Sequence, residues 1–291
     1  MKILEPTKHN IIAFIHLWDK MCDNWKILLF EGAETQTDIS CIDGLKDIKD
    51  YWWQEALLND VFCDVGKGVD KTANAVILLD HFYHTRLQRN NLNENINRLF
   101  KYLTTGTNQE KPLLDRIREL DYNEFDRETF ELYLRNASYC IDEIIRAFKN
   151  DSIENEKEPY SFATKFCNRL NPKAFPIYDS YVIGMLDYYY SKLKKEGRLY
   201  PDEVDIKFYR ENLNKTALGN YKNLLILFHH LRKRYLGDNS TEFNFKDIDV
   251  FLWTYGKALE RINNTNESLE LLEFRELYPK RQWLTYHKND H

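Results

Sequence analysis

The sequence predicts an all-α, multi-helix globular protein. Only 10 Gly and 7 Pro occur among 291 residues, whereas a many-stranded sandwich or barrel needs more turn-forming residues. Apolar side chains recur at helical spacing in segment after segment, which is typical of amphipathic helices. Hydrophobic residues make up 43% of the chain, as in ordinary globular proteins. The length is sufficient for a sizeable core in one or two domains.

The first third of the chain is predicted to contain three helices, at residues 7–26, 42–59 and 69–90. Each shows apolar residues at helical spacing, and a proline precedes the first. Residues 27–41 are less regular and could hold a short strand or an irregular link. Residues 61–67 interrupt the pattern, so we expect a break there.

The remainder of the chain is predicted to be helical with one exposed acidic loop at 150–158. A helix that begins at 159 should end at Asn171, because the residue before Pro172 avoids the α region. An extended run at 174–178 follows, and Gly197 is expected to terminate the next helix. The predicted helices are 92–103, 111–120, 127–149, 159–170, 180–196, 207–214, 221–235 and 245–263.

This pattern suggests a division into three parts. Residues 1–67 form an N-terminal helical region, residues 68–262 a helical core, and residues 263–291 a C-terminal helical tail. No internal repeat and no low-complexity tract is present.

Composition also bounds the setting of the protein. No apolar run approaches the ~18 residues that span a bilayer, and the N-terminus lacks the pattern of a signal peptide. The five scattered cysteines include no CxxC pair, so we expect no metal and no cofactor. A cytoplasmic location and no membrane partner are expected, while the oligomeric state stays open. Gly-rich phosphate loops, nucleophile elbows and kinase or metalloprotease signatures are absent from the sequence.

Charge is unevenly distributed along the chain. The net charge is −5, but residues 161–235 contain 14 Lys and Arg against 7 Asp and Glu. This region is thus +7 and the rest of the chain is −12. A basic half-domain indicates an anionic partner such as DNA, although a solvated basic helix face would look the same.

The most informative segment is SFATKFCNRLNPKAFPIYDSYV, which runs from Ser161 to Val182. A helix is followed by a proline-ended break, a short apolar extended run, and Asp179 at the start of the next helix. The carboxylate of Asp179 is well placed to cap that helix by accepting the N–H of Tyr181 or Val182. Such a cap is a sufficient structural reason for this aspartate.

The same segment resembles the active-site strip of helix-hairpin-helix DNA glycosylases. Asp179 matches the catalytic aspartate of that family. Ser161, 18 residues earlier, stands at the position that carries a lysine in members that form a Schiff base, and Ala163 falls where the family has a small residue. The resemblance implies a glycosylase-like core with an N-terminal helical addition. It also implies a DNA N-glycosylase-like activity, in which an Asp carboxylate stabilises the cationic sugar as the base departs.

The resemblance also assigns roles to the neighbours of Asp179. Ser161 cannot form a Schiff base, so hydrolysis would be monofunctional, with Asp179 and Ser161 as the catalytic positions. Lys165 lies one turn after Ser161 and could contact a phosphate or pair with Asp179. Lys165, Tyr178 and Tyr181 are the expected pocket neighbours.

The strip departs from the family just before Ser161. The family presents Gly-apolar-Gly there, so that backbone N–H groups approach a phosphate, but this chain has Lys157, Glu158 and Pro159. A non-catalytic nucleic-acid or protein-binding helical module is therefore an alternative function. The residues predicted to contact nucleic acid are Lys165, Arg169, Arg232, Lys233 and Arg234.

Other constellations indicate weaker alternatives. The cations of the cluster at 229–235 also complement the end of an apolar helix. His81 and His84 lie one turn apart as a possible metal half-site without a visible third ligand. Asp249 and Tyr255 could reach a shared pocket from the helix at 245–263. Arg281 and His287 fit the spacing of HEPN-like ribonucleases, in which such a pair acts on the RNA 2′-OH and phosphate.

Overall fold

The computed structural model describes residues 5–12, 14–15, 18, 49–83, 85, 87, 91–105, 111–122, 127–149, 159–197, 220–237 and 243–265. Within these ranges all regular elements are helices and no strand occurs, which confirms the all-α prediction. The labelled helices are α2 (Lys49–Phe62), α3 (Val69–Tyr83), α4 (Leu92–Thr104), α5 (Leu113–Glu119), α6 (Arg127–Phe148), α7 (Tyr160–Leu170), α8 (Ser180–Lys195), α10 (Tyr221–Leu236) and α11 (Phe245–Thr265).

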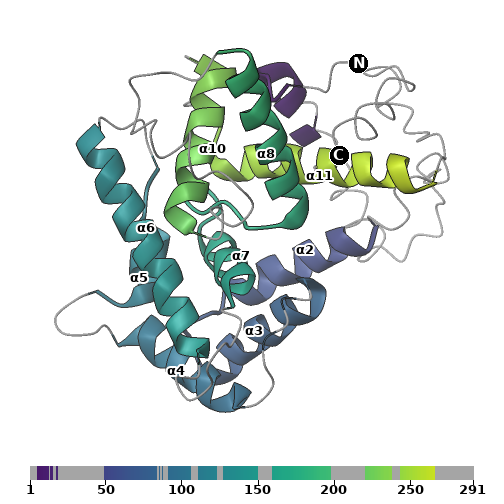
Figure 1. Ribbon diagram of the computed structural model, residues 1–291. Helices are drawn as coiled ribbons and strands as arrows, with labels where there is room; N and C mark the ends of the chain where they lie inside the picture. The colour runs from purple at the N-terminus through teal and green to yellow at the C-terminus, as the bar shows by residue number, and fades with distance from the viewer. Residues whose placement is uncertain are drawn as a thin grey trace.

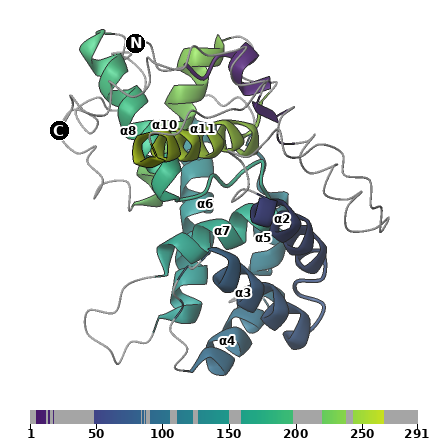
Figure 2. The ribbon, with the colours of Figure 1, turned by 90° about the vertical axis from the view of Figure 1, so that its right-hand side faces the viewer.

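The helices form two groups that meet at α7 (Figures 1 and 2). Helices α8, α10 and α11 make up one group, whereas α2, α3, α4 and α5 make up the other. The long helix α6 contacts α4, α5 and α7 as well as α10, and so joins the two groups. Helix α7 contacts α2, α3, α5 and α6, which places the strip of interest at the centre of the molecule.

A core rich in aromatic residues holds the first group together. Helices α8 and α11 pack against each other, and Tyr189, Phe251 and Tyr255 are completely buried between neighbouring elements. The ring of Phe14 meets that of Phe251 edge-on, with centroids 4.9 Å apart. Edge-to-face pairs of this kind add to the free energy gained from burying apolar area. The abundant aromatic residues of the sequence thus serve largely as core.

Two predicted helix ends are wrong. Helix α3 ends at Tyr83 rather than at residue 90, because the Asp80 side chain takes over the next donors. Its Oδ1 accepts the Leu87 N–H at 3.0 Å, in place of a helical carbonyl, and also accepts the Thr85 hydroxyl at 2.6 Å. Helix α2 continues to Phe62, so the break expected from residue 61 begins two residues later. Gly197 follows α8 with φ +64°, as expected of a glycine that ends a helix.

Several predictions lie outside the described residues. They concern the irregular segment 27–41, the acidic loop 150–158, the helix 207–214 and nearly all of the C-terminal tail from 266 onward. The three-part division of the chain stays a prediction. In the part of the chain that the structure describes, no helix is long and apolar enough to cross a membrane.

Candidate functional site

The strip between α7 and α8 is fixed by side chains from several helices. Helix α7 ends before Asn171-Pro172, as predicted. The carbonyl of Ala174 accepts the Tyr133 hydroxyl at 2.5 Å, and that of Phe175 accepts the Asn168 amide at 2.5 Å. Because these buried carbonyls have hydrogen-bond partners, an irregular segment can pass through the core without a large desolvation cost.

The anchoring continues up to the aspartate. The carbonyl of Pro176 accepts the Tyr221 hydroxyl at 3.2 Å. The N–H of Tyr178 donates to the Thr164 hydroxyl oxygen at 3.1 Å. Helices α6, α7 and α10 thus all hold the extended run, so the position of Asp179 is set by the packed core.

Asp179 caps helix α8. Its Oδ1 accepts the N–H of Tyr181 at 2.9 Å, and its carbonyl accepts the N–H of Ile183 at 2.8 Å. This confirms the predicted cap, which stabilises a helix by ~1 kcal/mol. The carboxylate lies 3.7 Å from the Lys165 ammonium and keeps 17% of its side-chain surface exposed. One oxygen is therefore committed to the cap, whereas the other faces the lysine.

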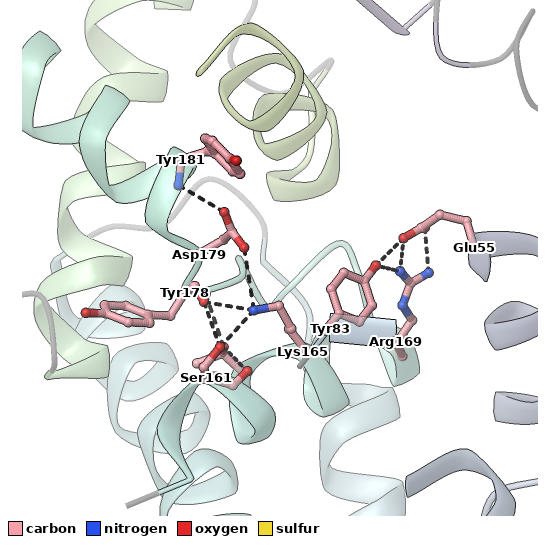
Figure 3. A network of polar contacts seen from close by, with 9 residues as sticks. Glu55, Tyr83, Ser161, Lys165, Arg169, Tyr178, Asp179 and Tyr181 are labelled. Atoms are coloured by element: carbon pink, nitrogen blue, oxygen red, sulfur yellow. Dashed lines mark hydrogen bonds and ion pairs between the residues drawn. The ribbon is translucent and has the colours of Figure 1, made fainter. Parts of the chain in front are cut away.

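Lys165 is the buried centre of the site (Figure 3). Its Nζ donates to the Ser161 hydroxyl oxygen at 2.8 Å and to the Tyr178 carbonyl at 3.3 Å. Only 5% of its side chain is exposed, and the Nζ lies 5.4 Å from the centre of the Tyr83 ring. Burial lowers the pKa of this ammonium, and the Asp179 carboxylate opposes that shift only in part.

The structure brings the five predicted catalytic and pocket residues together, although two of them take part through their backbone. Tyr178 contributes its carbonyl, while its ring packs edge-on against Tyr160. Tyr181 contributes its N–H, and its ring packs against Trp253. Ser161 donates to the same carbonyl of Tyr178 at 3.3 Å. The chemistry-bearing side chains of the cluster are therefore Ser161, Lys165 and Asp179.

The predicted nucleic-acid contacts are divided between the interior and the surface. The Arg169 guanidinium binds the Glu55 carboxylate, with Nη1 to Oε2 at 2.6 Å, and also contacts the Tyr83 hydroxyl (Figure 3). Arg232 is 4% exposed, and its guanidinium lies 4.7 Å from the centre of the Tyr122 ring. These two arginines have their charge engaged inside the protein. The partly exposed members of the predicted set are Lys233 and Arg234.

A small pocket adjoins the cluster on the side of α2, α3 and α11. It measures about 20 Å³, which is room for one water molecule. Asp249 lines this pocket, as suggested from the sequence, but Tyr255 does not and is instead fully buried. The lining residues are Trp18, Glu55, Tyr83, Ile177, Lys246, Asp249, Val250 and Trp253.

Two carboxyl groups of the pocket have opposite protonation behaviour. Burial raises the pKa of Asp249 to about 8, against the attraction of Lys246. Burial would also raise the pKa of Glu55, but the Arg169 and Lys246 cations together lower it to about 2. Asp249 is therefore neutral and Glu55 ionised at pH 7. Titratable groups whose pKa values are pushed apart in this way are typical of functional sites.

The sequence did not single out Glu55 or Lys246. The signal available for Lys246 was its position three residues before Asp249, which places both on one face of α11. Glu55 had no such signal, because its partner Arg169 is 114 positions away.

The described residues provide no further support for the metal-site and ribonuclease alternatives. His81 lies on α3, but His84 falls outside the described residues, and among those described no group of three His, Cys, Asp or Glu could hold a metal ion. Arg281 and His287 also lie outside the described part. The ribonuclease interpretation therefore stays a prediction.

Comparison with known proteins yields one informative relative. The chain is 32% identical over 162 residues to an uncharacterised protein of Haemophilus influenzae, and the match covers 51% of this chain and 68% of the relative. No protein-family profile matches the chain. No solved structure matches it significantly.

Proposed function

We propose that this chain, which belongs to the same family as the Haemophilus influenzae protein, is a DNA N-glycosylase-like hydrolase with a helix-hairpin-helix type core. In this proposal Asp179 is the catalytic carboxylate. Hydrolysis is monofunctional, because Ser161 offers no amine at the position where a Schiff base would form. The substrate is a nucleotide flipped out of DNA, and no cofactor is needed.

The observation that carries the proposal is the placement of Asp179. Its carboxylate lies where the anchored extended run meets α8, and it remains partly exposed. Ile177 of the same run lines the neighbouring pocket. The orientation of the carboxylate is fixed by the Tyr181 N–H and by Lys165. A fixed negative charge at a partly dry site is suited to stabilising a developing cation without reorganisation.

The proposed reaction breaks the bond between C1′ of the sugar and a nitrogen of the base. The bonding electron pair leaves with the base, and the sugar becomes an oxocarbenium-like cation. Asp179 stabilises that cation and orients the water that adds to C1′. The base gains one proton, and the water loses one after its attack, so that the products are the free base and an abasic sugar.

Lys165 serves this mechanism as a positioning residue. Its ammonium binds the Ser161 hydroxyl, the Tyr178 carbonyl and the Asp179 carboxylate together. Because it is almost fully buried, it does not present its charge to a DNA phosphate. Lys233 and Arg234, in the last turn of α10, are the residues of the predicted basic set that we assign to phosphate contact.

Binding to a transition-state analogue tests the proposal without knowledge of the base. We would compare a plain duplex with a duplex that carries a cationic pyrrolidine in place of one sugar, at one fixed salt concentration. The wild type should prefer the analogue by ~100-fold or more, and Asp179→Asn should lose that preference. Asp187→Asn on the same helix, which removes an exposed carboxylate, is the matched control and should retain it. Equal binding of both duplexes by the wild type would refute catalysis by Asp179.

A non-catalytic nucleic-acid or protein-binding module is the second candidate. It is favoured by the ion pair between Asp179 and Lys165, because a carboxylate that is already neutralised stabilises a sugar cation less. On this view Asp179→Asn leaves duplex binding intact, while Lys233→Ala with Arg234→Ala weakens it. Binding to neither duplex would exclude DNA as the partner and leave Asp179 as a helix cap.

A further inference from the structure

A carboxyl group that lines the pocket beside the proposed site has an oxygen without a hydrogen-bond partner among the described residues. Asp249 is 1% exposed, and among the described residues its Oδ1 makes no hydrogen bond although the side chain lines the pocket. A buried polar atom without a partner costs ~1–3 kcal/mol. Native proteins leave few such atoms unsatisfied, and a carboxyl group of this kind that lines a pocket points to a ligand group that completes it.

The charges around Asp249 define what that group can be. The charged groups that interact with it electrostatically are Lys246 on the same helix, Lys165 on α7, Asp179 at the start of α8 and Glu55 on α2. These are two cations and two carboxylates, and burial keeps Asp249 neutral up to about pH 8, the value to which its pKa is raised. A neutral carboxylic acid offers one O–H donor beside one carbonyl acceptor. It therefore pairs best with a ligand edge that presents an acceptor next to a donor.

The shape of the pocket adds a second restriction. Its volume of about 20 Å³ is room for a single water-sized polar group. The indoles of Trp18 and Trp253 also line the pocket, and their rings meet edge-on with centroids 6.0 Å apart. Aromatic side chains of this kind provide apolar surface for planar rings. A fitting ligand thus has a flat ring against the indoles and one exocyclic amino or keto group in this volume.

We propose that this pocket binds the edge of a neutral nucleobase that carries an acceptor next to a donor, with Asp249 as the residue that reads this edge. This inference rests on the proposed glycosylase function and names the class of base that the site would take. A cationic alkylated base gains no net attraction there, because the two cations and the two carboxylates around Asp249 offset each other. A base whose edge lacks the acceptor–donor pair would leave the Asp249 oxygen unsatisfied.

The pyrrolidine that replaces one sugar carries no base, so the proposed base pocket of the protein is empty in its complex with this duplex. Free adenine, cytosine or uracil is added in turn, and the Kd of the duplex complex is measured at pH 7. At least one of these bases should tighten duplex binding by ~5-fold or more, as for coupled ligands. The benzamidinium ion, a planar cation, should have no such effect.

Three variants separate base reading from a structural effect. Asp249→Asn keeps a neutral donor–acceptor pair and should retain the effect of the base, whereas Asp249→Leu should abolish it. Thr254→Val removes another buried hydroxyl of α11 that has no hydrogen-bond partner among the described residues, and it should behave as the wild type. As pH rises through 8, the effect should fade in the wild type and persist in Asp249→Asn.

The outcomes distinguish the two proposals. No preference of the wild type for the pyrrolidine duplex overturns both. A preference without any effect of the bases, an equal effect in Asp249→Leu, or an effect of benzamidinium alone overturns the base-reading role and leaves the glycosylase proposal standing. Loss of the effect in Asp249→Asn also overturns it, because a neutral amide should serve as well as a neutral acid.

Discussion

Replacing Asp249 by Asn should change the pH dependence of stability in a specific way. Burial raises the pKa of this carboxyl group from 3.8 to about 8, so the folded protein holds a proton that the unfolded chain has lost. The contribution of Asp249 to the free energy of unfolding of the wild type is therefore fully present below about pH 4 and is lost as pH rises towards 8. The loss is about 1.4 kcal/mol per pH unit between these limits. From pH 5 to pH 7.5 it amounts to about 3 kcal/mol.

The assay is urea denaturation of the wild type and Asp249→Asn at both pH values, followed by far-UV circular dichroism. The buried amide has its own free-energy cost, but that cost is the same at both pH values and cancels in the difference. The free energy of unfolding of the variant minus that of the wild type should therefore be about 3 kcal/mol more positive at pH 7.5 than at pH 5. If this difference in the free energy of unfolding does not change with pH, Asp249 is ionised in the folded protein and is not a neutral acid.

Three further predictions concern stability. Arg169→Met leaves the buried Glu55 carboxylate with the more distant Lys246 ammonium, 3.8 Å away, and should lower the free energy of unfolding by ~3–5 kcal/mol; the double variant with Glu55→Gln should recover most of the loss in urea denaturation. Asn171→Ala removes the amide that donates to partly buried carbonyl groups at the end of α5, at 2.7 Å and 2.9 Å, and should cost ~1 kcal/mol, measured as a lower Tm. Asp179→Ala should lose ~1 kcal/mol with the cap, whereas Asp179→Ser keeps a capping oxygen and should melt close to the wild type; equal Tm values for these two variants would contradict the capping role.

Local signals in the sequence were sufficient for much of the fold. The spacing of apolar residues identified the helices around the strip, and Pro172 placed the end of α7 correctly. The cap by Asp179 also followed from its neighbours alone, because a capping bond joins residues two positions apart. The error at the end of α3 arose because Asp80 replaces helical hydrogen bonds by side-chain bonds, which apolar spacing cannot reveal.

The environment of the charged residues could not be predicted in this way. Arg169 and Arg232 resembled surface cations in the sequence, yet one pairs with Glu55 and the other lies over Tyr122. Both partners are distant in sequence, and only the packed structure decides whether a cation faces water or a carboxylate. The pocket is lined by residues of α2, α3 and α11, which lie far apart in the sequence. No single segment could therefore predict its full lining.

The anchoring of the extended run has a consequence for folding. Its carbonyls are bound by Tyr133 and Tyr221, which lie 41 and 45 positions away along the chain. Contacts between such distant residues close large loops, and they tend to form late on the folding pathway. The orientation of Asp179 is therefore gained only once α6, α7 and α10 have docked. A partly folded chain, however rich in helix, would lack the geometry of the site.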